Sequence, residues 1–600
     1  MTTPGPSHFR FKLWRSVGAA LLLGAAACGA PETKQSEARQ QTRQQARTVF
    51  VNGVVYTADG AGSLAEAVAV ADGRILRVGA RDEIMALAGE ETEIVDMRGG
   101  MLLPGFTDAH THLVDGGSTL TSLSVHDAES IDDILSTVSE YAAANPELEV
   151  LVGSGWALPM FAGGNPDKAL LDSVEAERPV ILYAADGHNA WLNSAALARA
   201  GVTAQTPDPD NGRIERGADG EPSGTLRESA TQLIEPLLPV ATVETSMLDL
   251  IAGMRFQNAM GYTASVDASV PPGVIEDAYV ATTEQGLSTL RMTLSMLPST
   301  DFTDKDIDAS AFDARIEALK ARRARIDAVN PSMLKADMVK IFADGVLENQ
   351  TGAMIEPYVG VAGESRGVLN IAPDTLAAYA TALDAAGFNI HIHAIGDAAV
   401  RTALDAVEAA QAANPERERH HHLAHIELID PADIPRFAGL GVAANMQTLW
   451  AYADSYITDL TEPFVGPERS RWLYPNGALR DAGAFLVSGS DWPVSTSDPF
   501  DAMEVAVTRM APEGGAGPWL PQHRLAVNDM LKALTINGAV LTGEDAERGS
   551  IEAGKRADLI VIDANPLDID PSDLSEIAVT MTLLDGKAVY TRGVDEDRAP

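Results

Sequence analysis

Two histidines one residue apart, His110 and His112, follow an apolar segment in the stretch PGFTDAHTHL. Side chains of a strand alternate between its two faces, so residues two apart share a face at a separation of about 6.5–7 Å. Two imidazoles placed in this way can bind one metal ion, which then needs one or two further nitrogen or oxygen ligands. The spacing predicts part of a metal site whose remaining ligands come from elsewhere in the chain.

Three later apolar segments supply candidates for these ligands. FNIHIHAIGD contains His391 and His393, HHLAHIEL contains His425, and FLVSGSDWPV contains Asp491. If the segments are parallel strands of a barrel, their carboxyl ends meet at one mouth. We expect His391 to support the site or to lie deeper in the barrel. The predicted metal ligands are His110, His112, His393, His425 and Asp491. Three neighbouring histidines are expected near the surface, without a role: His420, His421 and His422.

Lys340 alternates with Met338 and Phe342 in ADMVKIFADG, and this alternation predicts a side chain directed into the barrel. A buried, unpaired ammonium group is costly, so Lys340 must lose its charge, pair with an acid or be chemically modified. One interpretation is a lysine that reacts with carbon dioxide and bridges two metal ions as a carbamate. The other is a structural lysine paired with a nearby acid such as Asp344.

Composition restricts the class of partner. The chain of 600 residues contains 46% hydrophobic and 22% charged residues, a globular balance that excludes wholesale disorder. Its formal net charge of −41 disfavours nucleic acid, whose phosphates it would repel, and basic-patch adhesion to anionic membranes. The expected partner is instead a small-molecule substrate of the metal site predicted above. The oligomeric state stays open, with a homodimer as one alternative.

Residues 1–28 have the composition of a bacterial lipoprotein signal peptide. A basic start precedes a short apolar segment, Val17–Ala27, and the only cysteine of the chain, Cys28, follows it. The position of Cys28 resembles a lipobox, although Ala25 replaces the usual leucine. Residues 29–47 are polar and rich in glutamine, as a flexible tether would be. We expect an exported protein with a lipid anchor at Cys28 in the bacterial cell envelope, facing the periplasm. The alternative is a soluble periplasmic or secreted protein.

Eight apolar segments, most of them separated by amphipathic helices, predict an α/β fold with a (β/α)8 TIM-like barrel over residues 100–545. About 150 residues separate the first two strands, too many for a loop, and predict an inserted subdomain at about 120–245. The expected strands are Gly100–Ala109, Thr263–Asp267, Arg291–Met296, Ala336–Phe342, Asn389–Ala394, His421–Glu427, Gly441–Met446 and Ala484–Ser488.

Both ends of the chain outside the barrel have a β-rich texture. Residues 48–99 and 546–595 contain short Val- and Ile-rich segments separated by Asn-Gly and Asp-Gly turn signals. We predict that the two regions combine into one small β-sandwich domain.

Several of these motifs together resemble the amidohydrolase superfamily, specifically its YtcJ-like (amidohydrolase 3) branch. The resemblance rests on PGFTDAHTHL, DGHNAWLNSAAL, GEPSGTLRESA, VKIFADGVLENQTGAM, HIHAIGDAAV, SGSDWPV and GSIEAGKRADLIVID, and it extends from about Thr48 to Gly593. Two segments depart from the family pattern: NMQTLW lacks the usual Gln-Pro followed by histidine, and HHLAHIEL lacks the usual Arg-Ile-Glu. Neither departure changes a predicted ligand.

The resemblance implies a role for each predicted ligand. His110 and His112 would bind one metal, while His393 and His425 would bind a second metal or complete the first. Lys340 would bridge two ions if carboxylated, and Asp491 would serve as a ligand and as the group that transfers protons. The cofactor is then one or two divalent ions, with zinc as the expected metal.

The expected reaction is hydrolysis of a C–N bond in a non-peptide amide, formamide, cyclic amide or N-acyl compound. A metal-activated hydroxide attacks the carbonyl carbon, and Asp491 passes a proton to the leaving amine. The insert is expected to contribute His188, Asn193 and Trp156 to substrate binding. The alternatives are ester or lactone hydrolysis or deamination at the same site, or a non-catalytic substrate-binding lipoprotein.

Overall fold

The computed structural model describes residues 45–299, 312–361, 363–515 and 517–594. The predicted signal peptide, with Cys28, and residues 29–44 of the predicted tether lie outside this part of the chain. All described residues belong to one compact unit. In these ranges, none of the helices has both the length and the apolar character needed to cross a membrane.

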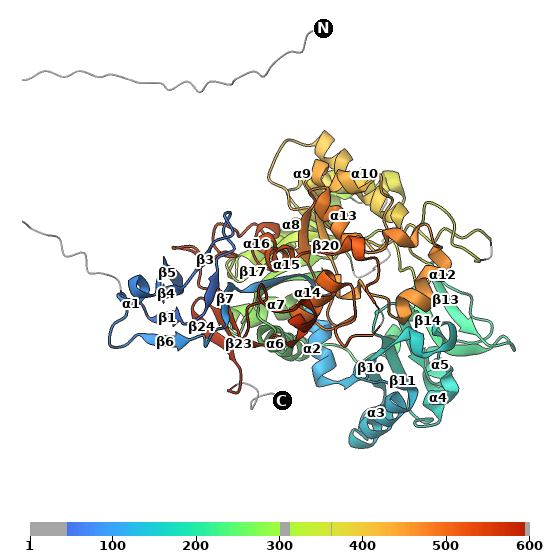
Figure 1. Cartoon of the computed structure of the whole chain (residues 1–600). Coiled ribbons are helices and arrows are strands. Elements are labelled where there is room, and N and C mark those ends of the chain that lie inside the picture. Colours follow the sequence, from blue (N-terminus) through green and yellow to red (C-terminus); the bar gives the residue numbers. More distant parts are fainter. Residues whose placement is uncertain (1–44, 300–311, 362, 516, 595–600) are drawn as a thin grey trace, which may run out of the picture. The chain divides into compact units, whose positions relative to one another are not determined.

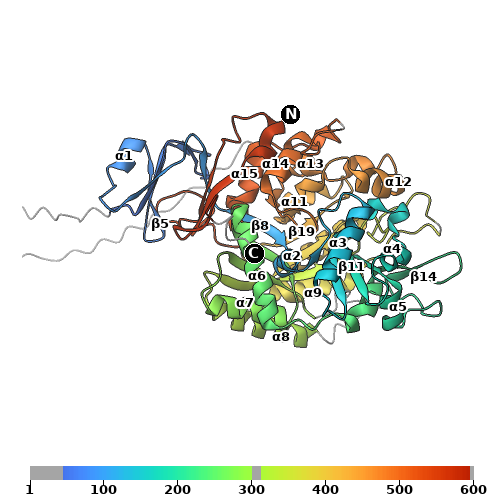
Figure 2. The same ribbon diagram turned by 90° about the horizontal axis from the view of Figure 1, so that it is seen from below.

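Eight parallel strands form a nearly closed barrel, which confirms the predicted barrel (Figure 2). Each strand pairs with the next along the chain, so the sheet begins at β8 and ends at β21. The two end strands meet through the loop after β21, where the Asp491 amide donates to the His110 carbonyl at 2.7 Å. The strands are β8 (Phe106–Thr111), β15 (Tyr262–Val270), β16 (Arg291–Met296), β17 (Leu334–Phe342), β18 (Asn389–Ala394), β19 (His422–His425), β20 (Ala443–Met446) and β21 (Phe485–Ser488).

Helices surround the barrel because each has an apolar stripe to bury. In α10 the buried residues Val400, Ala403, Leu404 and Val407 recur with helical spacing on one face. Figure 2 shows β8 and β19 inside the ring that these helices form. The principal helices are α2 (Leu113–Thr121), α6 (Val243–Ala259), α7 (Val274–Glu284), α8 (Phe312–Asp327), α9 (Pro373–Ala385), α10 (Asp397–Ala413), α11 (Ile434–Leu440), α13 (Asn476–Asp481), α14 (Pro499–Thr508), α15 (Val527–Leu534) and α16 (Ile536–Leu541).

The first expected strand, Gly100–Ala109, is two strands in the structure. β7 (Met101–Pro104) belongs to another sheet, and β8 begins at Phe106. Between them, Gly105 packs so closely that a Cβ there would lie 2.3 Å from the side chain of Thr263. The Pro-Gly pair therefore redirects the chain from one sheet into the next.

Between β8 and β15 the chain builds a separate six-stranded sheet in the order β13-β14-β12-β11-β10-β9, drawn in teal in Figure 1. Its residues fall within the range where an insert was expected. Three helices accompany it: α3 (Ile131–Ala144), α4 (Lys168–Asp172) and α5 (Ser194–Ala200). The strands are β9 (Leu123–Ser124), β10 (Leu151–Trp156), β11 (Val180–Ala184), β12 (Asn189–Leu192), β13 (Gly212–Arg216) and β14 (Pro222–Glu228).

Strands from the two ends of the described chain share one six-stranded sheet, ordered β24-β23-β22-β7-β2-β3. A second, four-stranded sheet of the order β5-β4-β1-β6 is built from the first end alone, with α1 (Arg81–Met85) beside it (Figure 1). The remaining strands are β1 (Thr48–Val51), β2 (Val54–Tyr56), β3 (Leu64–Ala65), β4 (Ala67–Ala71), β5 (Arg74–Gly79), β6 (Glu93–Asp96), β22 (Leu559–Ile562), β23 (Val579–Leu584) and β24 (Lys587–Thr591).

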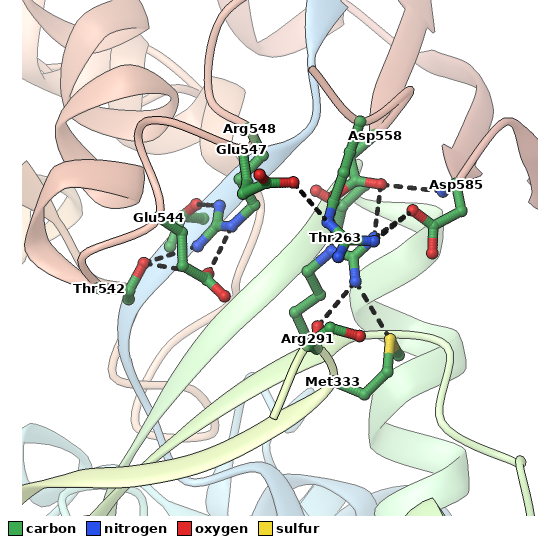
Figure 3. Close-up of polar contacts among 12 residues, drawn as sticks. Thr263, Arg291, Met333, Thr542, Glu544, Glu547, Arg548, Asp558 and Asp585 are labelled. Atoms are coloured by element: carbon green, nitrogen blue, oxygen red, sulfur yellow. Dashed lines mark hydrogen bonds and ion pairs between the residues drawn. The ribbon is translucent and has the colours of Figure 1, made fainter. Parts of the chain in front are cut away.

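A buried ion pair connects this shared sheet to the barrel (Figure 3). Arg291, the first residue of β16, donates to both carboxylate oxygens of Asp558 at 2.7 and 3.0 Å and to Asp585 at 2.7 Å. The side chains of Arg291 and Asp558 are 3% and 2% exposed. Because removing one partner of a buried pair costs about 3–5 kcal/mol, this contact holds the C-terminal strands firmly against the barrel.

Candidate metal centre

The predicted ligands lie at the carboxyl ends of the barrel strands. His110 is near the end of β8, Lys340 is near the end of β17, and His425 ends β19. His112 directly precedes α2, and Asp491 follows β21. Parallel strands bring these chain positions to one mouth, which is where barrels of this type carry their chemistry.

The Asp491 carboxylate is the point at which three histidines meet. Its Oδ1 atom lies 3.2 Å from Nε2 of His110 and 3.1 Å from Nε2 of His112, and its Oδ2 atom lies 3.8 Å from Nδ1 of His425. One ligand atom each from His110, His425 and Asp491 lies within 4.8 Å of the others, and all three residues are buried. The structure thus brings the predicted histidines of β8 and β19 to the predicted aspartate.

The donor atoms of this cluster fit a cation. Nδ1 of His425 and Oδ1 of Asp491 are buried and make no hydrogen bond with a described residue. Burial, with a further contribution from Lys340, lowers the pKa of His110 to about 3, so its ring is neutral. Burial opposes ionisation of Asp491, but His110 and His112 outweigh it and hold the pKa well below its ordinary value. Burial likewise lowers the pKa of His425, so His110 and His425 offer neutral imidazoles beside a carboxylate. These are nitrogen and oxygen ligands that a divalent ion such as zinc binds.

Outer contacts orient His110 and His112. Nδ1 of His112 lies 3.1 Å from Oγ of Ser269, and Nδ1 of His110 lies 3.0 Å from Nε2 of His391. His391 continues to Oγ of Ser295 through its own Nδ1, at 3.1 Å. Such contacts fix the tautomer of a metal-binding histidine and leave Nε2 as its ligand atom. His391 therefore lies beneath His110, in a supporting position.

His393 lies beside the cluster. Its Nε2 donates to the Gly345 carbonyl at 3.1 Å, which leaves Nδ1 as the atom available to a metal. The ring centroids of His393 and His425 are 4.6 Å apart. This position is compatible with a ligand to a second ion or with a completing ligand to the first.

Lys340 is buried next to the cluster, with Nζ 3.3 Å from Nε2 of His110. Burial lowers its pKa to about 7. Among the described residues it forms no ion pair with Asp344, the structural alternative. That carboxylate instead accepts three backbone N–H bonds, from Ala353, Ile395 and Gly396. The contacts thus favour a reactive amine over a paired ammonium.

Of the three residues expected from the insert, the structure brings one to the cluster. His188 lies in the loop between β11 and β12, and the centroids of its ring and that of His393 are 6.1 Å apart. Its Nδ1 atom lies 2.9 Å from Oε2 of Glu228. Burial alone would lower the pKa of His188, but Glu228 outweighs this effect and raises the pKa to about 9.

Trp156 and Asn193 are instead part of the interior of the insert, which corrects the expectation of substrate contact. The Trp156 indole donates to the Leu182 carbonyl at 2.8 Å. Asn193 caps α5 by accepting from Ala196 and donates to the Glu175 and Arg178 carbonyls. Both side chains are fully buried, and their polar atoms serve the backbone of the insert.

Two groups of residues near the site differ from the sequence-based expectation. His421 and His422 are buried rather than at the surface, and the ring of His422 lies 4.0 Å from that of His391. Trp450 stacks on His425 with centroids 5.8 Å apart and an angle of 4° between the planes. Trp450 ends the segment NMQTLW, which departs from the family pattern, and it lies in a 3-10 helix, Thr448–Trp450, that follows β20. The sequence does not reveal that this short helix brings the indole against His425.

A model described as the amidohydrolase family matches residues 93–590 of the chain. Three curated relatives are each 29% identical to it. The protein LONG AFTER FAR-RED 3 of Arabidopsis thaliana aligns over 90% of this chain and 91% of its own length. The putative amidohydrolase YtcJ of Bacillus subtilis aligns over 91% of this chain and all of its own length. The N-substituted formamide deformylase of Arthrobacter pascens aligns over 91% of this chain and 98% of its own length.

Solved structures share the fold. An uncharacterized metal-dependent hydrolase from Pyrococcus furiosus superposes with a TM-score of 0.66 at 23% identity, covering 87% of this chain and all of the other. The likeness extends well beyond the barrel mouth, over most of the described chain.

Proposed function

The chain belongs to the amidohydrolase family of metal-dependent hydrolases acting on carbon–nitrogen bonds, and we propose that it hydrolyses the C–N bond of a small non-peptide amide. The substrate class is a formamide, a cyclic amide or another N-acyl compound. The relative from Arthrobacter pascens, an N-substituted formamide deformylase, supports this choice. The observation that carries the proposal is the convergence of His110, His425 and Asp491 on one buried point.

The chain's own residues divide the work of this reaction. His110, His112, His393 and His425 would hold one or two divalent ions, with zinc as the proposed metal. A bound ion of this type lowers the pKa of water from about 15.7 to about 7 and polarises an acyl oxygen. Asp491, buried and ionised, accepts a proton from the attacking water and returns it to the leaving nitrogen. Trp450 stacks on the ring of the buried His425 and so covers one of its faces.

We propose that Lys340 is carboxylated and that its carbamate would, with the histidines, hold the metal ions. The neutral form of an amine adds to carbon dioxide, with formation of one N–C bond and loss of one proton. The depressed pKa of Lys340 favours that neutral form. Its position beside Nε2 of His110, one of the proposed metal ligands, supports this role.

The test is a substrate screen with the chain from residue 29 onward, purified with zinc and bicarbonate. Formamides, cyclic amides and N-acyl amines are assayed for amine release, with matched esters and amidines as separate arms. Release of amine from at least one amide, abolished in His110→Ala, is expected. Turnover confined to esters or to ammonia release from amidines would replace the proposed reaction with one of the alternatives.

We further propose that the protein is exported and held in the cell envelope by a lipid on Cys28, with residues 29–44 as the tether. The predicted tether ends at residue 47, but Ala46 and Arg47 hydrogen-bond to the folded chain at Leu87 and Val70. The basic start, the short apolar segment and the position of Cys28 support this. In a bacterial host the wild-type chain is expected in the membrane fraction and to incorporate labelled palmitate. A Cys28→Ala chain that stayed in the membrane fraction would contradict the anchor.

The arrangement of the remaining sheets supports two structural proposals. The six-stranded sheet between β8 and β15 is an inserted subdomain, and the two terminal sheets together form a β-sandwich. The hydrophobic cluster formed by Phe50, Val68, Leu102, Leu559 and Leu583 contains residues from both terminal sheets, as the interior of a sandwich does.

A further inference from the structure

The insert places one pair of ionisable residues beside the metal ligands. His188 and Glu228 are joined twice, by the contact of Nδ1 with Oε2 at 2.9 Å and by the Glu228 amide, which donates to the His188 carbonyl at 2.8 Å. Their side chains are 23% and 14% exposed. The pair is therefore fixed at the edge of the site, with the imidazole ring directed toward His393.

The second carboxylate oxygen of Glu228 is bound to the barrel. Its Oε1 atom accepts from Oγ1 of Thr351 at 2.7 Å and from Nδ2 of Asn349 at 3.3 Å, both in the segment that follows β17. In the same segment a Cβ at Gly345 would lie 3.2 Å from Oε1 of Glu228. The Gly345 carbonyl in turn accepts from His393. Glu228 and the metal-ligand candidate His393 thus both contact the segment that follows β17.

Glu228 occupies a strained backbone conformation. It is the last residue of β14 and has φ of 50°, in the left-handed region that non-glycine residues seldom adopt. Such a conformation costs about 1–3 kcal/mol and persists only where the surroundings enforce it. In this conformation the Glu228 carboxylate contacts both His188 and the segment after β17.

We propose that Glu228 is a positioning residue that holds His188 with its Nε2–H directed at the acyl oxygen of the substrate. The inference rests on the proposed amide hydrolysis and adds to it a donor supplied by the insert. A carboxylate on Nδ1 favours the imidazole with protons on both nitrogens. Nε2 is then the remaining donor, and no described residue hydrogen-bonds to it. A donor fixed before the reaction stabilises the negative charge that develops on the acyl oxygen.

Three carboxyl groups and one imidazole face His188. Glu228, Asp186 and Glu348 favour its positive charge, and His393 lies on the side of the cluster. Asp186 also accepts the His188 backbone amide at 2.8 Å, which fixes the turn. The His188 backbone is thus held by Asp186, within the insert. Its ring is held by Glu228, which also contacts the segment after β17.

The test compares Glu228→Gln and His188→Gln with the matched control Glu215→Gln. Glu215 lies in the same sheet and accepts from Arg227 at 2.7 Å, but it does not contact His188. On the best amide from the screen, kcat is expected to fall roughly 10²–10³-fold in His188→Gln, as for the loss of one oxyanion donor, with KM changed little. Glu228→Gln should lower kcat at least tenfold, and the double variant no further than His188→Gln. Glu215→Gln keeps wild-type values.

A binding measurement makes the outcome independent of turnover. Zinc-loaded protein is titrated with acetohydroxamate, whose carbonyl oxygen would accept the same hydrogen bond. At least tenfold weaker binding is expected in His188→Gln and in Glu228→Gln at unchanged zinc content. Equal binding in all four proteins would overturn the inference, even if amide hydrolysis is established. A wild-type protein that binds acetohydroxamate through His188 but hydrolyses no amide would overturn the proposed function and leave the donor in place.

Discussion

Asp491 and His110 meet across the seam of the barrel, where Oδ1 of Asp491 lies 3.2 Å from Nε2 of His110 and the Asp491 amide donates to the His110 carbonyl at 2.7 Å. His110 is on the first barrel strand, and Asp491 follows the last. The same two residues therefore close the barrel through their backbones and meet in the metal centre through their side chains. A change that opens this seam is expected to remove both the closure and the metal centre.

Asp491→Asn tests the proton-transfer role. Asp491 has φ of 57°, a conformation that asparagine also tolerates, so the variant keeps the backbone. An amide accepts no proton at neutral pH, and kcat is expected to fall by about 10²–10⁴-fold. Steady-state kinetics and metal content are measured together. Full turnover at unchanged metal content would exclude Asp491 as the proton carrier.

Lys340→Met tests the carbamate. Because the pKa of Lys340 is about 7, its reactive neutral fraction grows as the pH rises through 7 and shrinks below it. The metal content of the wild type, loaded with zinc and bicarbonate, should therefore exceed that of Lys340→Met by more at pH 8 than at pH 6. Elemental mass spectrometry measures both. If the difference in metal content between wild type and Lys340→Met is the same with and without bicarbonate, Lys340 has a structural role.

His391→Gln tests the outer contact to His110. The variant removes the ring that fixes the His110 tautomer from beneath, and zinc affinity is expected to fall by roughly 10–100-fold. Competition with a chelating dye measures the affinity without reference to catalysis. His420→Gln is the control, since His420 precedes β19 and has no contact with the cluster among the described residues. Unchanged affinity in His391→Gln would limit His391 to a packing role.

Asp384→Asn tests how β19 is held in place. The buried Asp384 carboxylate lies 2.8 Å from Arg417, 2.9 Å from Arg419 and 3.3 Å from His421. Burial opposes its charge, but His421 and the arginines outweigh this and hold its pKa far below the ordinary 3.8. Loss of the charge should lower the free energy of unfolding by about 3–5 kcal/mol at pH 7.

The same carboxylate predicts a pH dependence of stability. Because its pKa is lowered by folding, its contribution is fully present above pH 3.8 and is lost as the pH falls through the folded value. The difference in denaturant midpoint between wild type and Asp384→Asn should therefore be constant near neutrality and shrink in acid. Equal midpoints at pH 7 would show that the three cations do not depend on Asp384.

The sequence predicts the barrel well where strands are apolar, buried and flanked by helices. The expected Arg291–Met296 and Asn389–Ala394 agree with β16 and β18 in both bounds. The first expected strand is two strands in the structure, a division that the sequence hides because β7, Gly105 and the start of β8 form one continuous apolar segment. The close approach of Gly105 to Thr263, where the two strands separate, depends on tertiary structure. Alternation of side chains indicates a face but not the sheet to which a strand belongs.

The sequence likewise places some residues of the candidate site correctly and others not. His110 and His425 could be placed from strand periodicity, because the carboxyl ends of parallel strands meet. Trp156 and Asn193 have the residue types of a binding site, but their partners are backbone groups of the insert. Glu228 lies in the motif GEPSGTLRESA, but the sequence does not reveal its role, which depends on a backbone conformation with positive φ.

Metal content is the measurement that tests the central claim most directly. The chain from residue 29 onward is purified with zinc and bicarbonate, and elemental mass spectrometry compares wild type with His110→Ala and Lys340→Ala. Near two ions per chain, reduced in both variants, is the predicted result. About one ion, unchanged in Lys340→Ala, would contradict the lysine bridge. Wild-type protein without metal in any preparation would contradict the metal centre itself.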